Sequence, residues 1–407
     1  MKKHGVMLFT FVILFLTLGC DLAYGQGEEG NEKEEVTVTL DFSKKGAFGL
    51  KNNTSQSVLT DITFKVQDLS VSLTGYTCHY IGTNKYLRLD YDANHPGQLQ
   101  ISVPKPIVID SITMRTTKKG IFIKYNNKFL SATEKKPIVE SINSNNITLT
   151  ESKKTGESLS SYITSITLTY TRPKLDATLD EKGENVESTI SGIAGANKTL
   201  ALNRTFNPSQ LYTMCLPFDL SKKMITEIFG NKTQVYSYDG YQNGELSFST
   251  VKENVVKAGM PFLMRSEYYV EQPKFADVTV RSTTAQTVCG GEWDLCGTFG
   301  SYELVADGTQ LFLIADGTLA KPKADSRPMR GFRCYLQKHT GTVNGSAQLP
   351  SVTIDGETNA IKTAEYAAPT SGTTAYSLSG MKLNAGCKTA NGGIMIINGK
   401  KFITTNR

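Results

Sequence analysis

Histidine is scarce in this chain, with 4 residues among 407, and tryptophan occurs once. Three of the histidines, His79, His95 and His339, lie beyond the N-terminal segment, and none stands in a Gly-x-Ser-x-Gly or cysteine-centred catalytic motif. Because nucleophilic catalysis needs a base beside its nucleophile, this scarcity argues against a histidine-dependent hydrolase. Because histidine is scarce, the sequence also contains no cluster of histidine and cysteine residues of the kind that binds zinc.

A strong net charge is also missing, since the formal charge is only +6 and no dense lysine and arginine patch occurs. The composition therefore gives no indication of nucleic-acid binding. Residues 192–199, GIAGANKT, resemble a phosphate loop only superficially. Asn197 stands where the loop requires its second glycine, and a strand pattern follows instead of a helix. We expect no nucleotide, metal or other cofactor.

Long hydrophobic runs are confined to the N-terminus, since no later run approaches the roughly 18 to 20 residues that span a bilayer. Lys2 and Lys3 precede the apolar residues 6–18, which is typical of a signal peptide over residues 1–25. Residues 17–20 resemble a lipobox ending in Cys20, whereas residues 23–25 fit an ordinary signal-peptidase site. We expect an exported protein, secreted or held at the outer membrane and cell surface. A lipid on Cys20 would anchor it to a membrane.

Seven cysteines are present, and six remain if Cys20 is lipidated or removed with the signal peptide. Export permits disulfides, but six cysteines in so long a chain do not make a disulfide scaffold. Cys289 and Cys296 flank the sequence GGEWDL and can pair across a turn. The alternative is that the cysteines are small buried apolar side chains with free thiols.

Short alternating segments and turn residues dominate the remainder of the chain. Residues 26–35 are polar and acidic, which is typical of a disordered stalk. About eight short strands are expected within residues 36–171, so the fold class is all-β with tandem, jelly-roll-like β-sandwiches. The charged residues 172–187 read as a linker before a second β-rich domain, residues 188–355.

One short helix is expected in the second domain. Ser221 is suited to cap it, Met224, Ile225, Ile228 and Phe229 share a face, and Gly230 ends it.

The C-terminal residues 375–407 predict a small module of β-hairpins, which residues 356–374 connect to the second domain. Ser379-Gly380 and Asn398-Gly399 separate short alternating runs. Asn-Gly between apolar runs is a strong hairpin signal, because both central residues of a type I′ turn need a positive φ.

Two pieces of the chain resemble surface proteins of Bacteroidetes. The segments LNRTF and LYTMCLPFDLS, followed by AGMPFLM at 258–264 and GFRCYL at 331–336, resemble a recurrent β-module of their secreted and surface proteins. The segment YSLSGMKL with GGIMIINGKKFI is similar to the C-terminal domains that sort some of these proteins for type IX secretion. The resemblance implies a cell-surface location and supplies no catalytic residue.

Aromatic side chains are the candidate ligand-binding residues. Sugar-binding sandwiches often stack aromatic rings on pyranose faces, and Tyr76, Tyr80, Tyr86 and Tyr91 fall close together. The alternative is that these tyrosines cover half-buried sheet surface.

The predicted function is non-catalytic binding or adhesion to a glycan or to a host or matrix protein. No residue is assigned a catalytic or metal-binding role. A secreted glycan-processing enzyme would need two close carboxyl groups in a cleft, and the sequence alone does not place such a pair. A structural surface component is the remaining alternative.

Overall fold

Alternating segments form strands throughout the described residues, and helices are few. The computed structural model describes residues 32–52, 56–81, 85–117, 121–133, 135–152, 160–208, 210–252, 255–323, 328–339, 349–359 and four short strands between 375 and 403. Within these residues the expected all-β, multi-sheet fold is confirmed. None of their helices is long and apolar enough to cross a membrane.

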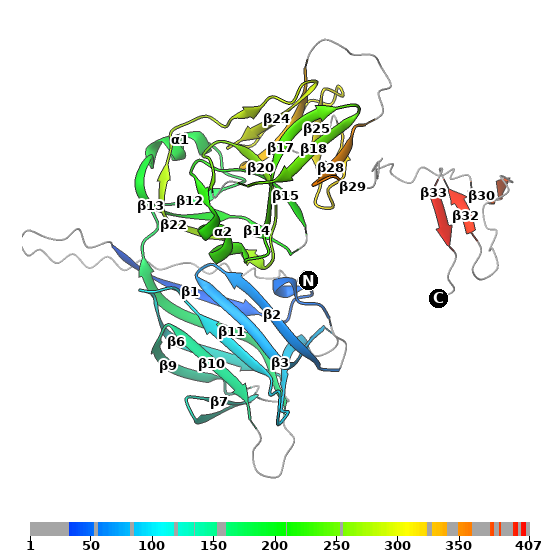
Figure 1. Ribbon diagram of the computed structural model, residues 1–407. Helices are drawn as coiled ribbons and strands as arrows, with labels where there is room; N and C mark the ends of the chain where they lie inside the picture. The colour runs from blue at the N-terminus through cyan, green and yellow to red at the C-terminus, as the bar shows by residue number, and fades with distance from the viewer. Residues whose placement is uncertain are drawn as a thin grey trace, which may run out of the picture.

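The first domain consists of strands joined by short connections (Figure 1). They are β1 (Lys33–Asp41), β2 (Val58–Val66), β3 (Leu69–Ile81), β4 (Lys85–Asp90), β5 (Gln98–Ser102), β6 (Val108–Thr116), β7 (Ile121–Tyr125), β8 (Lys128–Ala132), β9 (Ile138–Ser144), β10 (Asn146–Glu151) and β11 (Ser160–Pro173). A short 3-10 helix, η1 (Ala47–Gly49), follows β1. The start of β1 takes in the last three residues of the expected stalk.

Strand pairing divides the first domain into two layers that β4 joins. One layer has the order β2-β3-β5-β10-β7-β8, and the other has the order β1-β11-β6-β9. The strand β4 pairs with the end of β3 and with the start of β11. Side chains of both layers, including Leu73, Leu99, Ile112 and Leu168, form one core. This arrangement is a β-sandwich.

The strand β3, like β8 and β9, was not expected from the sequence pattern. It follows β2 through a tight turn in which Gln67, rather than a glycine, has a φ of 54°. Gly75 has a φ of 72°, and a Cβ there would lie 2.1 Å from the carbonyl oxygen of Pro96. This glycine therefore permits the close approach at the point where β3 leaves β5 and begins to pair with β4.

The second domain contains three larger sheets. The first has the order β12 (Ala177–Asp180), β13 (Gly195–Asn203), β22 (Lys274–Val280). The next has the order β15 (Leu211–Cys215), β20 (Pro261–Arg265), β17 (Gln234–Gln242), β18 (Glu245–Thr250), β28 (Ser351–Ile354), β29 (Glu357–Asn359). The last has the order β23 (Thr287–Val288), β24 (Trp293–Thr298), β27 (Arg333–Lys338), β25 (Gln310–Leu313), β26 (Leu319–Ala320).

Two cores hold these sheets together. Tyr236 and Leu263 of the β15–β29 sheet belong to the same core as Trp293 and Leu336 of the β23–β26 sheet. On the other side, Val235 belongs to a core with Leu200 and Phe275 of the β12–β22 sheet. The central sheet is therefore covered on both faces. A small pair, β16 (Leu220–Ser221) with β19 (Val255–Val256), lies beside it.

The structure contains two α-helices among its described residues, whereas one was expected. The expected helix is α2 (Lys222–Phe229), and the Oγ of Ser221 accepts a hydrogen bond from the N–H of Met224 at 3.2 Å. The unexpected helix is α1 (Val186–Gly192), which begins after Asn185 in a left-handed conformation without a side-chain cap. Asn185 is of a residue type that often caps helices, but its side chain makes no capping hydrogen bond here.

Residues 172–187, expected to be a linker, contain regular and buried structure. The strand β12 pairs in parallel with β13, and Leu179 and Glu181 are buried. The first turn of α1 also falls in this range. Residues 172 and 173 end β11 of the first domain. Residues 177–187 belong to the second domain, and Glu181 takes part in its packing.

The two domains share hydrogen-bonded strands. The strand β21 (Tyr269–Glu271) of the second domain pairs in parallel with β2 and antiparallel with β14 (Thr205–Phe206). Figure 1 shows α2 and β14 on the side of the second domain that faces the first. The ring of Tyr269 packs edge-on against Phe48 at 6.0 Å between centroids. The first domain's sheet thus continues into the second domain.

The C-terminal module is a sheet in the order β31 (Lys382–Leu383), β30 (Ala375–Ser377), β32 (Ile394–Ile397), β33 (Lys400–Ile403). Its pairs β30–β31 and β32–β33 are antiparallel, as two hairpins require. The turn residues Ser379-Gly380 and Asn398-Gly399 lie outside the described residues. Of the expected connector, residues 357–359 form β29.

Candidate functional site

A half-open cavity of about 390 Å³ lies in the second domain, between β15 and the neighbouring strand β25. Leu211, Tyr212 and Thr213 contribute one wall from β15, which is the edge strand of its sheet. Apolar side chains form most of the opposite wall, namely Leu304, Phe312, Leu313, Ile314 and Met329. Three arginines complete the lining, Arg204, Arg330 and Arg333, and no carboxylate side chain is among these lining residues.

Arg204 is held rigidly at the base of this arginine cavity. It lies between β13 and β14 and is only 4% exposed. Its Nη1 donates to the carbonyl oxygens of Thr213 and Phe332 at 3.1 and 3.3 Å. The guanidinium carbon lies 5.2 Å from the ring centres of both Phe206 and Tyr212. These contacts fix the plane of the guanidinium without using all its donors.

Glu181 supplies the negative charge for the arginines. Its Oε1 accepts a hydrogen bond from Nη1 of Arg330, and its Oε2 accepts one from Nη2 of Arg333, each at 2.7 Å. The Nε of Arg204 lies 3.6 Å from the same Oε2, as an ion pair. One buried carboxylate therefore faces three guanidinium groups, which leaves the cluster with a net positive charge of about two, counting full ionisation at neutral pH.

Several buried donors of this cluster have no hydrogen-bond partner among the described residues. They are Nε and Nη2 of Arg204 and Nε of Arg333. Burial lowers the pKa of Arg204 to about 9, and the neighbouring charge of Arg333 adds to the effect. Unused buried donors and an excess of positive charge both favour an anionic ligand in the arginine cavity.

Among the tyrosines expected to bind a ligand, the described side chains of Tyr76, Tyr86 and Tyr91 differ in burial. Tyr86 is buried and packs edge-on against Tyr162 with ring centres 5.0 Å apart. Tyr76 is partly buried and lies 6.3 Å from the ring of His95. Tyr91 is exposed, and the backbone of Tyr80 pairs with that of Tyr86. For Tyr76 and Tyr86, the sheet-surface alternative fits the observed packing.

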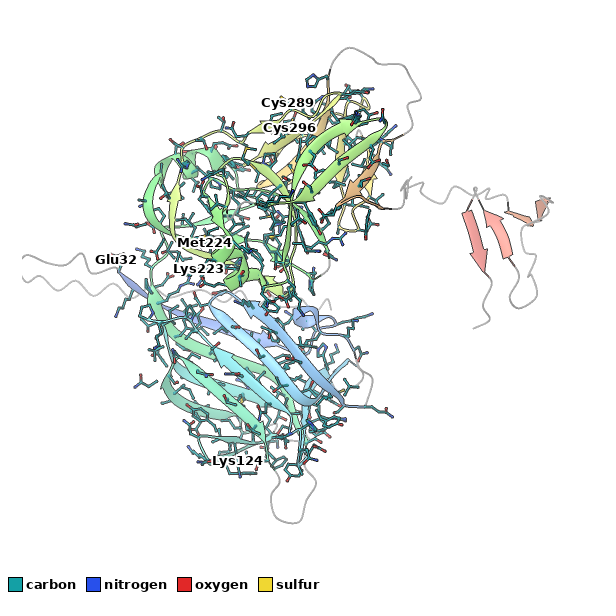
Figure 2. All side chains as sticks on the ribbon, viewed as in Figure 1. Glu32, Lys124, Lys223, Met224, Cys289 and Cys296 are labelled. Carbon is teal, nitrogen blue, oxygen red and sulfur yellow. The ribbon has the colours of Figure 1, made fainter. Side chains whose placement is uncertain are left out.

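The disulfide considered between Cys289 and Cys296 is not formed. Both are free thiols, with Cys289 exposed and Cys296 partly buried. Figure 2 shows both at the same end of the second domain. The register of β23 and β24 places Cys296 opposite Thr287, so Cys289 falls beyond the paired residues. The buried Cys78, Cys215 and Cys334 do not take part in a disulfide either. Cys20 and the signal peptide lie outside the described residues.

A second group of polar side chains lies inside the first domain. Glu151 is 2% exposed, and neither of its carboxyl oxygens has a hydrogen-bond partner among the described residues. Burial raises the pKa of Glu151 to about 8, and the nearby Asp90 carboxylate contributes in the same direction. The Oδ2 of Asp90 forms an ion pair with Nη2 of Arg88 at 3.1 Å. Neither carboxyl group lines the arginine cavity.

Sequence reasoning missed the arginine cavity. The only signal in the sequence was that Arg204 and Arg333 stand in segments that carry the family resemblance, Arg204 in LNRTF and Arg333 in GFRCYL. Glu181 was assigned to a linker. Arg330 immediately precedes the GFRCYL segment and Arg333 lies within it, without an acidic neighbour in sequence. The four charges meet only through folding.

Comparison with known proteins gives no further identification. No protein-family model matches the chain, and no curated protein matches its sequence.

Proposed function

We propose that this chain is an exported, non-catalytic binding or adhesion protein of the cell surface, of the Bacteroidetes type. Its ligand is a glycan or a host or matrix protein. The signal-peptide pattern and the resemblance of the C-terminal module to sorting domains support the location. A lipid on Cys20 would provide the membrane anchor, and mass spectrometry of the mature N-terminus distinguishes a lipidated Cys20 from a chain that begins at Gln26.

The observation that carries the binding function is the arginine cavity. It combines a rigid, buried Arg204 with unused donors and an apolar wall. Binding sites commonly consist of apolar walls with a few polar groups that orient the ligand, in cavities of roughly 300 to 1,000 Å³. The cavity's about 390 Å³ is near the lower end of that range, which suits one residue or one sugar unit of a larger partner.

The double variant Arg330→Gln, Arg333→Gln tests this function. We expect its affinity for the partner to fall by about tenfold or more, because each lost charge-assisted hydrogen bond is worth roughly 1.5 to 3 kcal/mol. The measurement is binding of the purified chain to glycan arrays and to immobilised matrix proteins.

Arg281→Gln is the matched control. Its side chain is 53% exposed against 52% for Arg330, and it also faces a carboxylate, Asp219, at 3.7 Å. Because the double variant also removes two partners of the buried Glu181, thermal unfolding of each protein is measured first, and binding is compared at a temperature at which all of them are folded. Binding that is unchanged in the double variant, or absent from every glycan and matrix protein with the wild-type chain, contradicts the proposal.

A further inference from the structure

We propose that the arginine cavity selects a carboxylate joined to an apolar body. This inference rests on the proposed binding function and narrows its ligand. The carboxylate is presented either by the last residue of a protein chain or by a free amphiphilic acid, and the same chemistry serves both.

The unused donors define the charged part of the ligand. Nε and Nη2 of Arg204 and Nε of Arg333 are buried without hydrogen-bond partners among the described residues. Both oxygens of Glu181 are already engaged by Arg330 and Arg333. A second carboxylate is therefore the natural complement, because its two planar oxygens match the fork of a guanidinium group.

The apolar wall defines the rest of the ligand. Leu304, Phe312, Ile314 and Met329 line the cavity with side chains that offer no strong hydrogen-bonding group. A phosphate or sulfate with no apolar body would leave this wall uncovered, whereas an aliphatic or aromatic group buries it.

A sugar acid fits the cavity less well. Each hydroxyl of a pyranose needs a partner, and the lining has neither a carboxylate nor a side-chain amide. The hydroxyl of Tyr212 already donates to Gln210 at 2.8 Å and accepts from the N–H of Asn207 at 2.6 Å. Thr213 is the other side-chain hydroxyl in the wall. The cavity therefore offers few hydrogen-bond partners for the hydroxyl groups of a sugar, and most of its contacts with a ligand are apolar.

Titration calorimetry of the purified chain tests the inference with four probes. They are N-acetyl-Gly-Gly-Leu-Phe with a free carboxyl group, the same peptide as its C-terminal amide, octanoate, and glucuronate. We expect the peptide acid to bind at least tenfold more tightly than its amide and than glucuronate. If octanoate binds as tightly as the peptide acid, the inference is supported and the ligand is a free amphiphilic acid. If the peptide acid binds more tightly than octanoate, the ligand is the C-terminal end of a protein chain.

Two variants locate the binding. Arg333→Gln should weaken binding of the peptide acid at least fivefold, and Arg281→Gln should leave it unchanged. If Arg333→Gln does not fold, the more exposed Arg330→Gln takes its place.

An amide that binds as tightly as the acid overturns the inference, as does a failure of all four probes to bind. Glucuronate binding more tightly than both apolar acids also overturns it, but leaves the broader binding function standing. If the chain binds glycans or matrix proteins on the arrays but none of the four probes, the inference is likewise overturned while the binding function stands. If the wild-type chain binds neither the probes nor any glycan or matrix protein on the arrays, the proposed binding function is contradicted too.

Discussion

At the scale of single residues, two buried glutamates, Glu181 and Glu151, have opposite electrostatic surroundings. In the second domain, Glu181 is buried but accompanied by three guanidinium groups. In the first domain, Glu151 is buried without a cationic partner among the described residues, and burial raises its pKa to about 8. A buried carboxyl group of this kind is most stable in its neutral form. The stability of the folded first domain therefore depends on pH in part through Glu151.

Glu151→Gln should remove that dependence. Between pH 4.5, the ordinary pKa, and about 8, the folded chain keeps the proton that the unfolded chain releases. Stability contributed by Glu151 is therefore present at low pH and lost as the pH rises through this window. We expect the variant to exceed wild type by about 2 to 4 kcal/mol at pH 8.5 and to differ little at pH 4.5.

Urea unfolding at several pH values measures this difference, and Glu303→Gln, at an exposed position, is the control. His79 acts in the opposite direction, because burial lowers its pKa and acid favours its unfolding. The difference between Glu151→Gln and wild type isolates the carboxyl group from that effect. An equal pH dependence in both proteins would refute the assignment.

At the scale of elements, helix α2 follows directly from its local sequence. Ser221 caps the first turn through the N–H of Met224, and Phe229 is buried in the second domain's core. The chain turns away at Gly230, whose φ is 106° and whose N–H donates to the carbonyl oxygen of Thr226 at 3.1 Å. Helix start and stop signals of this kind depend on neighbours in sequence, so α2 was predictable. The helix α1 lacks such a cap and was missed.

Ser221→Ala should lower the free energy of unfolding by about 1 kcal/mol, because the N–H of Met224 loses its acceptor. Ser221→Asn keeps an acceptor at the same position and should stay within about 0.5 kcal/mol of wild type. Denaturant midpoints of the three proteins measure the effect. Equal losses in both variants would show that the hydroxyl contributes through something other than capping.

At the scale of the whole molecule, Asp68 connects the two domains. It lies in the turn between β2 and β3, and its side chain is 7% exposed. Its Oδ2 accepts hydrogen bonds from Tyr170 at 2.8 Å and Arg172 at 2.9 Å, both in the first domain. Lys274 of the second domain donates to the same oxygen. The parallel pairing of β2 with β21 and the bond from Lys65 to the Glu227 carbonyl oxygen add to this interface.

Asp68→Asn should destabilise the protein by roughly 2 to 4 kcal/mol, because Arg172 and Lys274 lose their shared buried counterion. Asp61→Asn, at an exposed position on β2, should change stability by less than about 0.5 kcal/mol. Thermal unfolding monitored by circular dichroism compares the two. If both variants unfold like wild type, Asp68 does not hold the domains together.

By itself the sequence determined the strand-rich class, helix α2 and the paired strands of the C-terminal module. Each depends on residues that are close in the chain, where alternation, caps and turn residues act directly. Only the tertiary structure decided the interdomain pairing, the burial of Tyr86 and the arginine cavity. Parallel pairing leaves no turn signal in the sequence. Glu181 and Arg333 are 152 residues apart, and packing of distant strands, rather than any local pattern, brings their charges together.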